Sequence, residues 1–185
     1  MRKSEKEKML SEELYNASDP ILVEERKRAR LFTKRFNDSS AEEGNLRQII
    51  LTDLIGEHGE NLDIEPPFHC DYGSNITLGT NVYFNFGCLI LDVAPVTLGD
   101  NVLFGPGVQI YTVMHPENWE KRAAGLEFAL PISIGANVWI GGAAIICPGI
   151  EIGDRSIIGA GSVVTKNVPP DVYAAGNPSK VIRKL

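Results

Sequence analysis

The stretch IGANVWIGGAAIICPGIEIGDRSIIGAGSVVTKNV, residues 134–168, repeats one pattern every six positions. Each hexad begins with an aliphatic residue, usually followed by glycine, and a small or β-branched residue stands four places after it. The aliphatic positions are Ile134, Ile140, Ile146, Ile152, Ile158 and Val164. Helices and strands repeat every 3.6 and 2 residues, so neither explains a period of six. The pattern predicts a solenoid in which six residues form a short strand and a corner, three such faces complete a coil, and the aliphatic side chains fill the interior.

The same repeat is visible earlier in the chain, from about residue 66 onward. Its large apolar positions are Leu78, Phe84, Ile90, Leu98, Phe104 and Ile110, and Tyr72-Gly73 fits as an earlier hexad. The step from Ile90 to Leu98 is eight residues long, which predicts a two-residue bulge within residues 92–95. Three corners read Gly-x-Asn, at residues 79–81, 99–101 and 135–137, and asparagine tolerates the positive φ that suits a tight corner.

The repeat is absent between Ile110 and Ile134. A connection of this length is usually functional or disordered, and the aromatic residues and prolines of residues 111–133 argue against disorder. After Val168 the repeat stops at two prolines, and the tail that follows predicts a strand or a short helix closing the solenoid. We therefore predict a β-helix domain over residues 61–185 with an excursion loop over residues 111–133.

Residues 1–60 carry the signals of a helical N-terminal segment. Three pairs have helix-capping spacing: Ser4 with Glu7, Asp19 with Pro20, and Ser40 with Glu43. We expect a helix to begin at each of them, the first ending at about Asn16. The second helix contains the basic run Arg26 to Arg30, which is either a solvated helical face or the source of an arginine that reaches a polar substrate.

Composition narrows the function classes. The net charge of −6 argues against general nucleic-acid binding, and all 18 Lys and Arg residues lie within residues 1–47 or 121–184. The three cysteines, Cys70, Cys88 and Cys147, have no CxxC spacing, so the sequence suggests neither a disulfide framework nor a zinc site. The first residues have no apolar signal-peptide core, and no apolar run approaches the ~18 residues of a membrane span. We expect a cytoplasmic protein without a membrane segment.

His115 is the most informative single residue. It stands where the long loop leaves a complete coil, and Pro116 restricts its backbone to extended conformations. Near neutral pH an imidazole is largely uncharged and can accept a proton. The alternative is a loop histidine with no role. His58, before Gly59, is interpreted as a helix-capping residue. The sequence does not decide the role of His69, although it favours a structural one.

Other candidates follow from position in the coils. Asn85 is polar among apolar neighbours and satisfies a corner or binds a ligand between coils, while Asp71 and Asp92 could accept hydrogen bonds from hydroxyl groups. Residues 141–144 and 159–161 consist of Gly and Ala, so they expose backbone against which a slender ligand could lie. Near one end stand residues that could meet phosphates: Thr165, Lys166, Lys180 and Arg183.

At this point the chain resembles the hexapeptide-repeat acyltransferases, in particular the maltose and galactoside O-acetyltransferase group. The motifs that carry the resemblance cover the chain from EKEKMLSEELY through FHCDYGSNITLG, NFGCLILDV, LGDNVLFGPGVQIYT, the MHP around His115, PISIGANVWIGG, GAGSVVTKNVPPDV and AAGNPSKVIRKL. The family fold is a left-handed parallel β-helix in a homotrimer with active sites between subunits. The resemblance implies a mainly β protein of this kind, with a helical N-terminal segment and a short closing segment.

The resemblance also implies a reaction, the transfer of an acetyl group from acetyl-CoA to a sugar hydroxyl, with no metal. His115 matches the catalytic base, Asn85 the residue that stabilises the transition state and positions the acceptor, and the N–H of Gly142 an oxyanion donor. The positions that match CoA contacts are Gly142, Ala160, Thr165, Lys166, Lys180 and Arg183. The acceptor-side candidates are Arg26, Asp71, Tyr83, Asn85, Asp92 and Glu127, of which Glu127 either orients His115 or binds the acceptor.

Departures from the galactoside branch favour glucose or maltose as acceptor, with the 6-hydroxyl as the expected site. The galactoside branch has a second acid where this chain has Val93, serine at the positions of Asp71 and Gly142, and arginine at Lys180. Galactosides or other hydroxylated compounds remain alternatives, as does a non-catalytic binding trimer. A γ-type carbonic anhydrase requires three histidines on zinc, and the spacing of His58, His69 and His115 argues against it.

Overall fold

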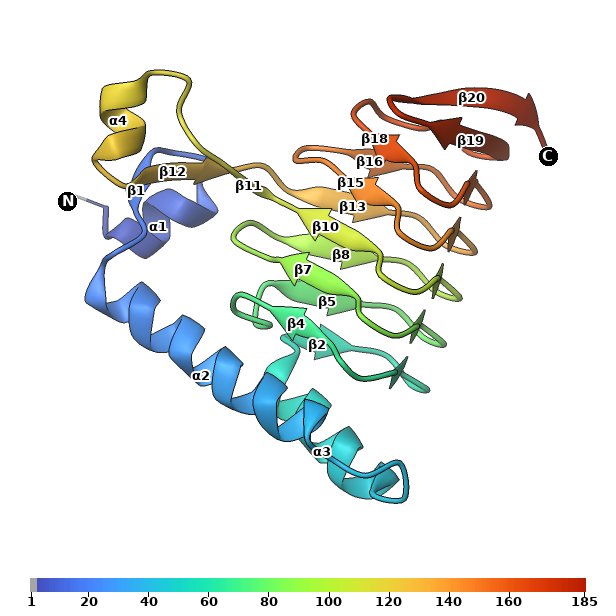
Figure 1. Ribbon diagram of the computed structural model, residues 1–185, viewed down its shortest axis with the longest axis horizontal. Coiled ribbons are helices and arrows are strands. Elements are labelled where there is room, and N and C mark those ends of the chain that lie inside the picture. Colours follow the sequence, from blue (N-terminus) through green and yellow to red (C-terminus); the bar gives the residue numbers. More distant parts are fainter. Residues whose placement is uncertain (1–2) are drawn as a thin grey trace.

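The computed structural model describes residues 3–185 and is a three-sided prism of stacked coils (Figure 1). The coils place their strands in three sheets, here named the first, second and third walls, and all strands but the last of the second wall pair in parallel. The first wall contains β2 (Glu57–His58), β5 (Ile76–Leu78), β8 (Val96–Leu98), β13 (Ile132–Ile134) and β16 (Glu151–Ile152). The second wall contains β3 (Asp63–Ile64), β6 (Tyr83–Phe84), β9 (Leu103–Phe104), β14 (Trp139–Ile140), β17 (Ile157–Ile158), β19 (Val172–Gly176) and β20 (Ser179–Lys184). The third wall contains β4 (His69–Cys70), β7 (Leu89–Leu91), β10 (Gln109–Tyr111), β15 (Ile145–Ile146) and β18 (Val163–Val164).

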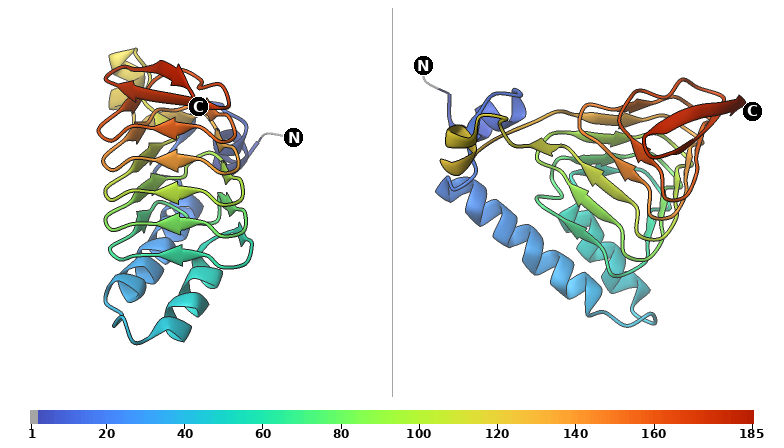
Figure 2. Two further views of the ribbon diagram at one scale, coloured as in Figure 1. Left: turned by 90° about the vertical axis from the view of Figure 1, so that its right-hand side faces the viewer. Right: turned by 45° about the horizontal axis from the view of Figure 1, so that its top comes forward.

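The hexad positions form the core, as predicted. Strands pair in parallel with hexad residues in register, for example Ile110 with Ile146 and Ile134 with Ile152, and these side chains are buried. Inside the prism the rings of Phe84 and Phe104 stack with centroids 4.5 Å apart. A parallel β-helix with a period of six residues is therefore confirmed, and Figure 2 shows the coils stacked along one axis.

The first coil begins earlier than residue 66, and the helical part ends before residue 60. β2 pairs with β5 and β3 with β6, so His58 aligns with Leu78 and Ile64 with Phe84. This coil was not recognised from the sequence for two reasons. His58 stands at a hexad position that is apolar in the other coils, and the step from Cys70 to Leu78 is eight residues instead of six. His58 is thus a strand residue and not a helix cap. Tyr72 also lies outside the hexad positions, because Cys70 is the residue in register with Ile90.

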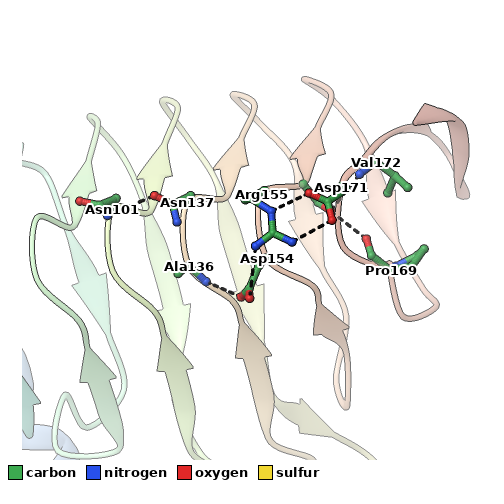
Figure 3. Close-up of polar contacts among 9 residues, drawn as sticks. Asn101, Ala136, Asn137, Asp154, Arg155, Pro169, Asp171 and Val172 are labelled. Atoms are coloured by element: carbon green, nitrogen blue, oxygen red, sulfur yellow. Dashed lines mark hydrogen bonds and ion pairs between the residues drawn. The ribbon is translucent and has the colours of Figure 1, made fainter. Parts of the chain in front are cut away.

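One corner of the prism carries a ladder of polar side chains between the first and second walls. Asn61, Asn81, Asn101 and Asn137 all have φ between 57° and 59°, and each side-chain amide donates to the next one along the stack. The last two coils replace asparagine with Arg155 and Asp171, which form a two-pronged ion pair (Figure 3). The Gly-x-Asn corners therefore supply the predicted positive φ and also link successive coils.

The N-terminal segment contains α1 (Glu5–Leu10), β1 (Tyr15–Asn16), α2 (Pro20–Asn37) and α3 (Gly44–Leu54). The predicted capping box at Ser4 and the N-cap at Asp19 are confirmed. The first helix ends at Leu10 and not near Asn16, because the following residues turn into β1. Ser40 does not cap α3, which begins at Gly44 without a side-chain cap. None of the helices within residues 3–185 combines the length and the apolar character needed to cross a membrane.

The excursion loop is ordered by pairing with the N-terminal segment. It contains β11 (Val113–Met114), α4 (Trp119–Ala123) and β12 (Leu126–Ala129), and β12 lies between β1 and β11 in an antiparallel sheet (Figure 1). A second apolar cluster holds this unit against the prism: Met9, Tyr15, Leu22, Tyr72, Val93, Ala94 and Ala129. At the other end of the prism the tail forms a β19–β20 hairpin, so the predicted closing segment is a pair of strands.

Candidate functional site

Four of the predicted site residues line one pocket. The pocket has a volume of about 330 Å³ and lies between α2, the end of the third wall and the excursion loop. Two of them lie on regular elements, Arg26 on α2 and Glu127 on β12. The other two directly follow strands, Asp71 after β4 and His115 after β11. The topology thus brings together residues that are up to about 100 positions apart in the sequence.

Glu127 is held by the N-terminal segment. β1 pairs with β12 so that Tyr15 lies opposite Glu127, and the Tyr15 hydroxyl donates a 2.6 Å hydrogen bond to the Glu127 carboxylate. Burial and the neighbouring carboxylate both raise the pKa of Tyr15 above its ordinary value, so the phenol stays protonated as the donor. The hydrogen-bond partner of Glu127 is therefore Tyr15. Glu127 lines the same pocket as His115, and both roles expected for it, orientation of His115 and contact with an acceptor, stay predictions.

Arg26 is also fixed within the pocket. Its guanidinium donates 2.6 Å hydrogen bonds to the Tyr72 hydroxyl and to the Ala17 carbonyl. Burial raises the pKa of Tyr72 to about 12, although the adjacent Arg26 lowers it in part. Arg26 therefore lines a polar pocket, whereas Lys27 and Arg28 of the same basic run are exposed. Contact of Arg26 with a substrate stays a prediction.

Asp92 corrects a prediction, because its side chain is fully buried and does not line the pocket. Its carboxylate accepts hydrogen bonds from the backbone N–H groups of Asp71, at 3.0 Å, and Tyr72, at 2.9 Å. The physical reason is the bulge after β7, which folds the side chain inward against the preceding coil. Asp92 therefore fixes the backbone that carries Asp71, and direct contact with an acceptor is excluded by its burial.

Asp71 itself remains at the pocket wall. Burial raises its pKa, and the positive charges of Arg26 and Arg30 oppose that shift. A half-buried carboxylate flanked by guanidinium groups is an acceptor for hydroxyl hydrogen bonds.

Tyr83 and Asn85 do not line this pocket. Tyr83 is on β6 of the second wall, and Asn85 is at the corner where the second wall leads into the third. The Asn85 side-chain oxygen accepts a 2.7 Å hydrogen bond from the Phe86 N–H. His115 follows the carboxyl end of a third-wall strand, whereas Asn85 precedes the amino end of β7 in that wall. Within one chain, His115 and Asn85 therefore lie at opposite edges of the third wall.

The corner of Asn85 continues to Gly142 and Ala160. The equivalent positions in successive coils are Phe86, Pro106, Gly142 and Ala160. The side chain of Asn85 accepts the N–H of Phe86, and Pro106 has no backbone N–H. Within residues 3–185, the N–H groups of Gly142 and Ala160 donate to no protein acceptor, whereas those of Gly141, Ala143 and Gly161 do. The chain thus presents two unpaired backbone donors on a surface almost without side chains, as the Gly and Ala content predicted.

The remaining candidates lie at the closing end of the prism. Thr165 and Lys166 follow β18 and are exposed. Lys180 and Arg183 are on β20, where the guanidinium of Arg183 stands 5.5 Å above the ring of Tyr173. The closing end of the prism thus carries the cations of Lys166, Lys180 and Arg183.

Sequence reasoning missed Tyr15 and Tyr72. Both belong to the second apolar cluster while their hydroxyls reach the pocket, so neither hexad position nor charge identified them. The only signal is that each tyrosine stands in a motif shared with the family, EELY and CDYG. Among residues 3–185, no three His, Cys, Asp or Glu side chains cluster closely enough to hold a metal ion.

Comparison with known proteins gives consistent results. Residues 8–59 match the maltose acetyltransferase hexapeptide capping motif, and residues 131–166 match the hexapeptide repeat of succinyl-transferase. Nodulation protein L of Rhizobium meliloti is 49% identical over 181 residues, which cover 98% of this chain and 99% of that protein. A maltose O-acetyltransferase structure from Clostridium difficile 630 has a TM-score of 0.98 at 48% identity, covering 99% of this chain and 98% of that one. A galactoside acetyltransferase in complex with coenzyme A has a TM-score of 0.95 at 42% identity, covering 99% and 92%. The chain therefore belongs to the hexapeptide-repeat acetyltransferases of the maltose and galactoside O-acetyltransferase family.

Proposed function

We propose that the protein transfers an acetyl group from acetyl-CoA to the 6-hydroxyl of a glucose- or maltose-type sugar in the cytoplasm. The observation that carries this proposal is the pocket in which His115 stands beside Arg26, Asp71 and Glu127. A base next to hydrogen-bonding groups of both kinds, donors and acceptors, suits a neutral substrate rich in hydroxyls.

In this mechanism His115 acts as general base. A sugar hydroxyl is too weakly acidic to ionise alone, so its proton moves to the imidazole as the oxygen attacks the thioester carbonyl carbon. The C–S bond then breaks, and the proton passes from His115 to the departing thiolate. Asp71 and Glu127 accept hydrogen bonds from other hydroxyls of the sugar and thereby fix which oxygen faces His115.

The unpaired N–H of Gly142 is the proposed donor to the oxyanion that forms on the carbonyl oxygen. A backbone donor held by its neighbours in the stack needs no reorganisation when charge develops. Ala160 continues the same corner, where its N–H would bind an amide of the pantetheine arm. Thr165, Lys166, Lys180 and Arg183 would then meet the phosphates and the nucleotide.

We infer further that the active enzyme is a homotrimer with sites between subunits. The outward residues of the first wall are polar: Glu57, Thr77, Thr97, Ser133 and Glu151. The second wall instead exposes Leu103 (48%) and Trp139 (52%), and the third wall carries half-buried Leu89, Ile145 and Val163. Two different apolar walls on one chain suit a head-to-tail contact, which closes into a ring.

Such a ring explains why one chain separates its candidate residues. If the second wall of one subunit covers the third wall of the next, Tyr83, Asn85 and the Gly142 corner approach the His115 pocket of the neighbour. Each complete site then takes the base from one subunit and the oxyanion donor from another.

The test is an acetyl-transfer assay. Acetyl-CoA is supplied with glucose, maltose or a thiogalactoside, and free thiol is followed together with the position of the acetyl group. We expect glucose-type sugars to accelerate thiol release most. The alternative, a galactoside or other acceptor, requires the thiogalactoside or an unrelated hydroxyl compound to do so.

The variant His115→Ala tests the role of His115 as the general base. It should lower turnover by about two to four orders of magnitude, because proton removal is lost, while CoA still binds. Lys121→Ala, in α4 of the same loop but outside the pocket, is the control. Unchanged turnover in His115→Ala would remove it as the base, and no acceleration by any sugar would refute the acceptor class.

A further inference from the structure

Helix α2 presents a row of cations to the third wall. Arg26, Arg30 and Lys34 are spaced four residues apart and therefore share one helical face. Beneath this helix, His69 and Asp71 flank the buried Cys70 of β4, so both point outward. The cations of α2 thus lie along the same side as the outward residues of the first coil.

Two adjoining pockets lie along this row. The first is the pocket of His115, lined in part by Arg26, Arg30 and Asp71. The second has a volume of about 460 Å³ and is lined by Arg30, Thr33, Lys34, Asn37, Asp38, Pro67 and His69. Because Arg30 lines both, the two pockets adjoin at this side chain, and together they offer more room along α2 than one small site.

The positive charges at the second pocket face two carboxylates, Asp38 within the pocket and Asp71 in the adjoining one. Lys34 pairs with Asp38 at 2.5 Å, and Arg30 lies close enough to Asp71 to oppose the rise in its pKa. Two hydrogen-bonding groups are left open, because the guanidinium of Arg30 and the imidazole of His69 make no hydrogen bond within residues 3–185. Since each cation has a carboxylate nearby and open hydrogen-bonding groups remain, the pocket suits a neutral, hydroxyl-rich group better than an anion.

We propose that this second pocket binds the neighbouring ring of an acceptor that has two or more sugar units, while the ring to be acetylated lies at His115. Arg30 bridges the two rings and His69 contacts the outer one. The proposal rests on the proposed function, since it extends the acceptor site of that reaction.

The experiment measures kcat/KM for glucose, maltose and maltotriose with saturating acetyl-CoA. The wild-type protein should prefer maltose to glucose by about fivefold to thirtyfold, as one or two added hydrogen bonds of ~1 kcal/mol predict, with little further gain for maltotriose. His69→Ala and Arg30→Gln should each lower this maltose-to-glucose ratio by about threefold or more. Lys27→Gln, exposed on the same helix and paired with Glu24, is the control and should leave the ratio unchanged.

The outcomes separate this proposal from the one on which it rests. Turnover of glucose with no preference for maltose, or a preference that both variants retain, overturns the second subsite alone. Absence of turnover with every sugar overturns the sugar acceptor and the subsite together.

Discussion

The buried carboxyl group of Asp92 makes the stability of the fold depend on pH. Burial raises its pKa from the ordinary value to about 7, although the N–H groups of Tyr72 and Asp71 act in the opposite direction. A pKa raised on folding means that the protonated form favours the folded state. This stabilising contribution is complete below about pH 4 and is lost as the pH rises through about 7.

Asp92→Asn tests this coupling, because an amide oxygen can still accept from the Asp71 and Tyr72 backbone but cannot ionise. The wild-type free energy of unfolding should fall relative to the variant by a few kcal/mol between pH 4 and pH 7.5, at ~1.4 kcal/mol per pKa unit. Urea denaturation of both proteins across this range measures the difference. A difference that does not change with pH would contradict the raised pKa.

At the scale of elements, the asparagine ladder links one coil to the next. Asn101 has φ of 57° and accepts from Asn81 at 3.0 Å. It donates to Asn137 at 3.1 Å (Figure 3). Asn101→Gly keeps the positive φ and removes the two side-chain hydrogen bonds, which should cost about 1 kcal/mol because the site is exposed. Asn101→Ala should cost roughly 1–2 kcal/mol more, because alanine is strained at positive φ. Thermal or urea unfolding gives both values, and an alanine variant as stable as the glycine variant would contradict the backbone argument.

The periodic elements were predictable from the sequence because each hexad repeats the same requirement: an apolar residue inward and a residue tolerant of the corner. The walls from Leu78 to Val164 follow from this pattern alone. The first coil was not predictable in the same way, since His58 interrupts the apolar pattern and its pairing with Leu78 becomes visible only when the coils stack.

In the excursion loop, single residues could be identified from the sequence but their long-range contacts could not. His115 was identifiable because it stands beside a proline where the repeat is interrupted. The partnership of Tyr15 with Glu127 depends on strand pairing across 112 residues, which no short-range periodicity encodes. Asp92 was misjudged for a related reason: whether an acid in a bulge points outward or inward depends on the backbone donors of the preceding coil.

At the scale of the whole molecule, the three walls differ in what they expose. A trimer closed by the second and third walls predicts that Trp139→Glu, at the centre of an apolar wall, weakens assembly. Thr97→Glu, on the polar first wall, should leave it intact and serves as the matched control. A trimer closed in this way also predicts which subunit supplies each part of the site.

Mixed trimers test that division directly. His115→Ala and Asn85→Ala should each be strongly impaired alone, since every site then lacks either the base or the positioning amide. Coexpression in equal amounts should restore about a quarter of the wild-type activity, because a site is complete only where a subunit with intact His115 meets a neighbour with intact Asn85, each at a probability of about one half. Sites built within one chain would give no restoration, since every chain in the mixture carries one defect. Purification through two different tags keeps only mixed trimers, in which one site of the three is complete, so the expected activity rises to about a third. The thiol-release assay on these trimers therefore separates an interfacial site from an internal one.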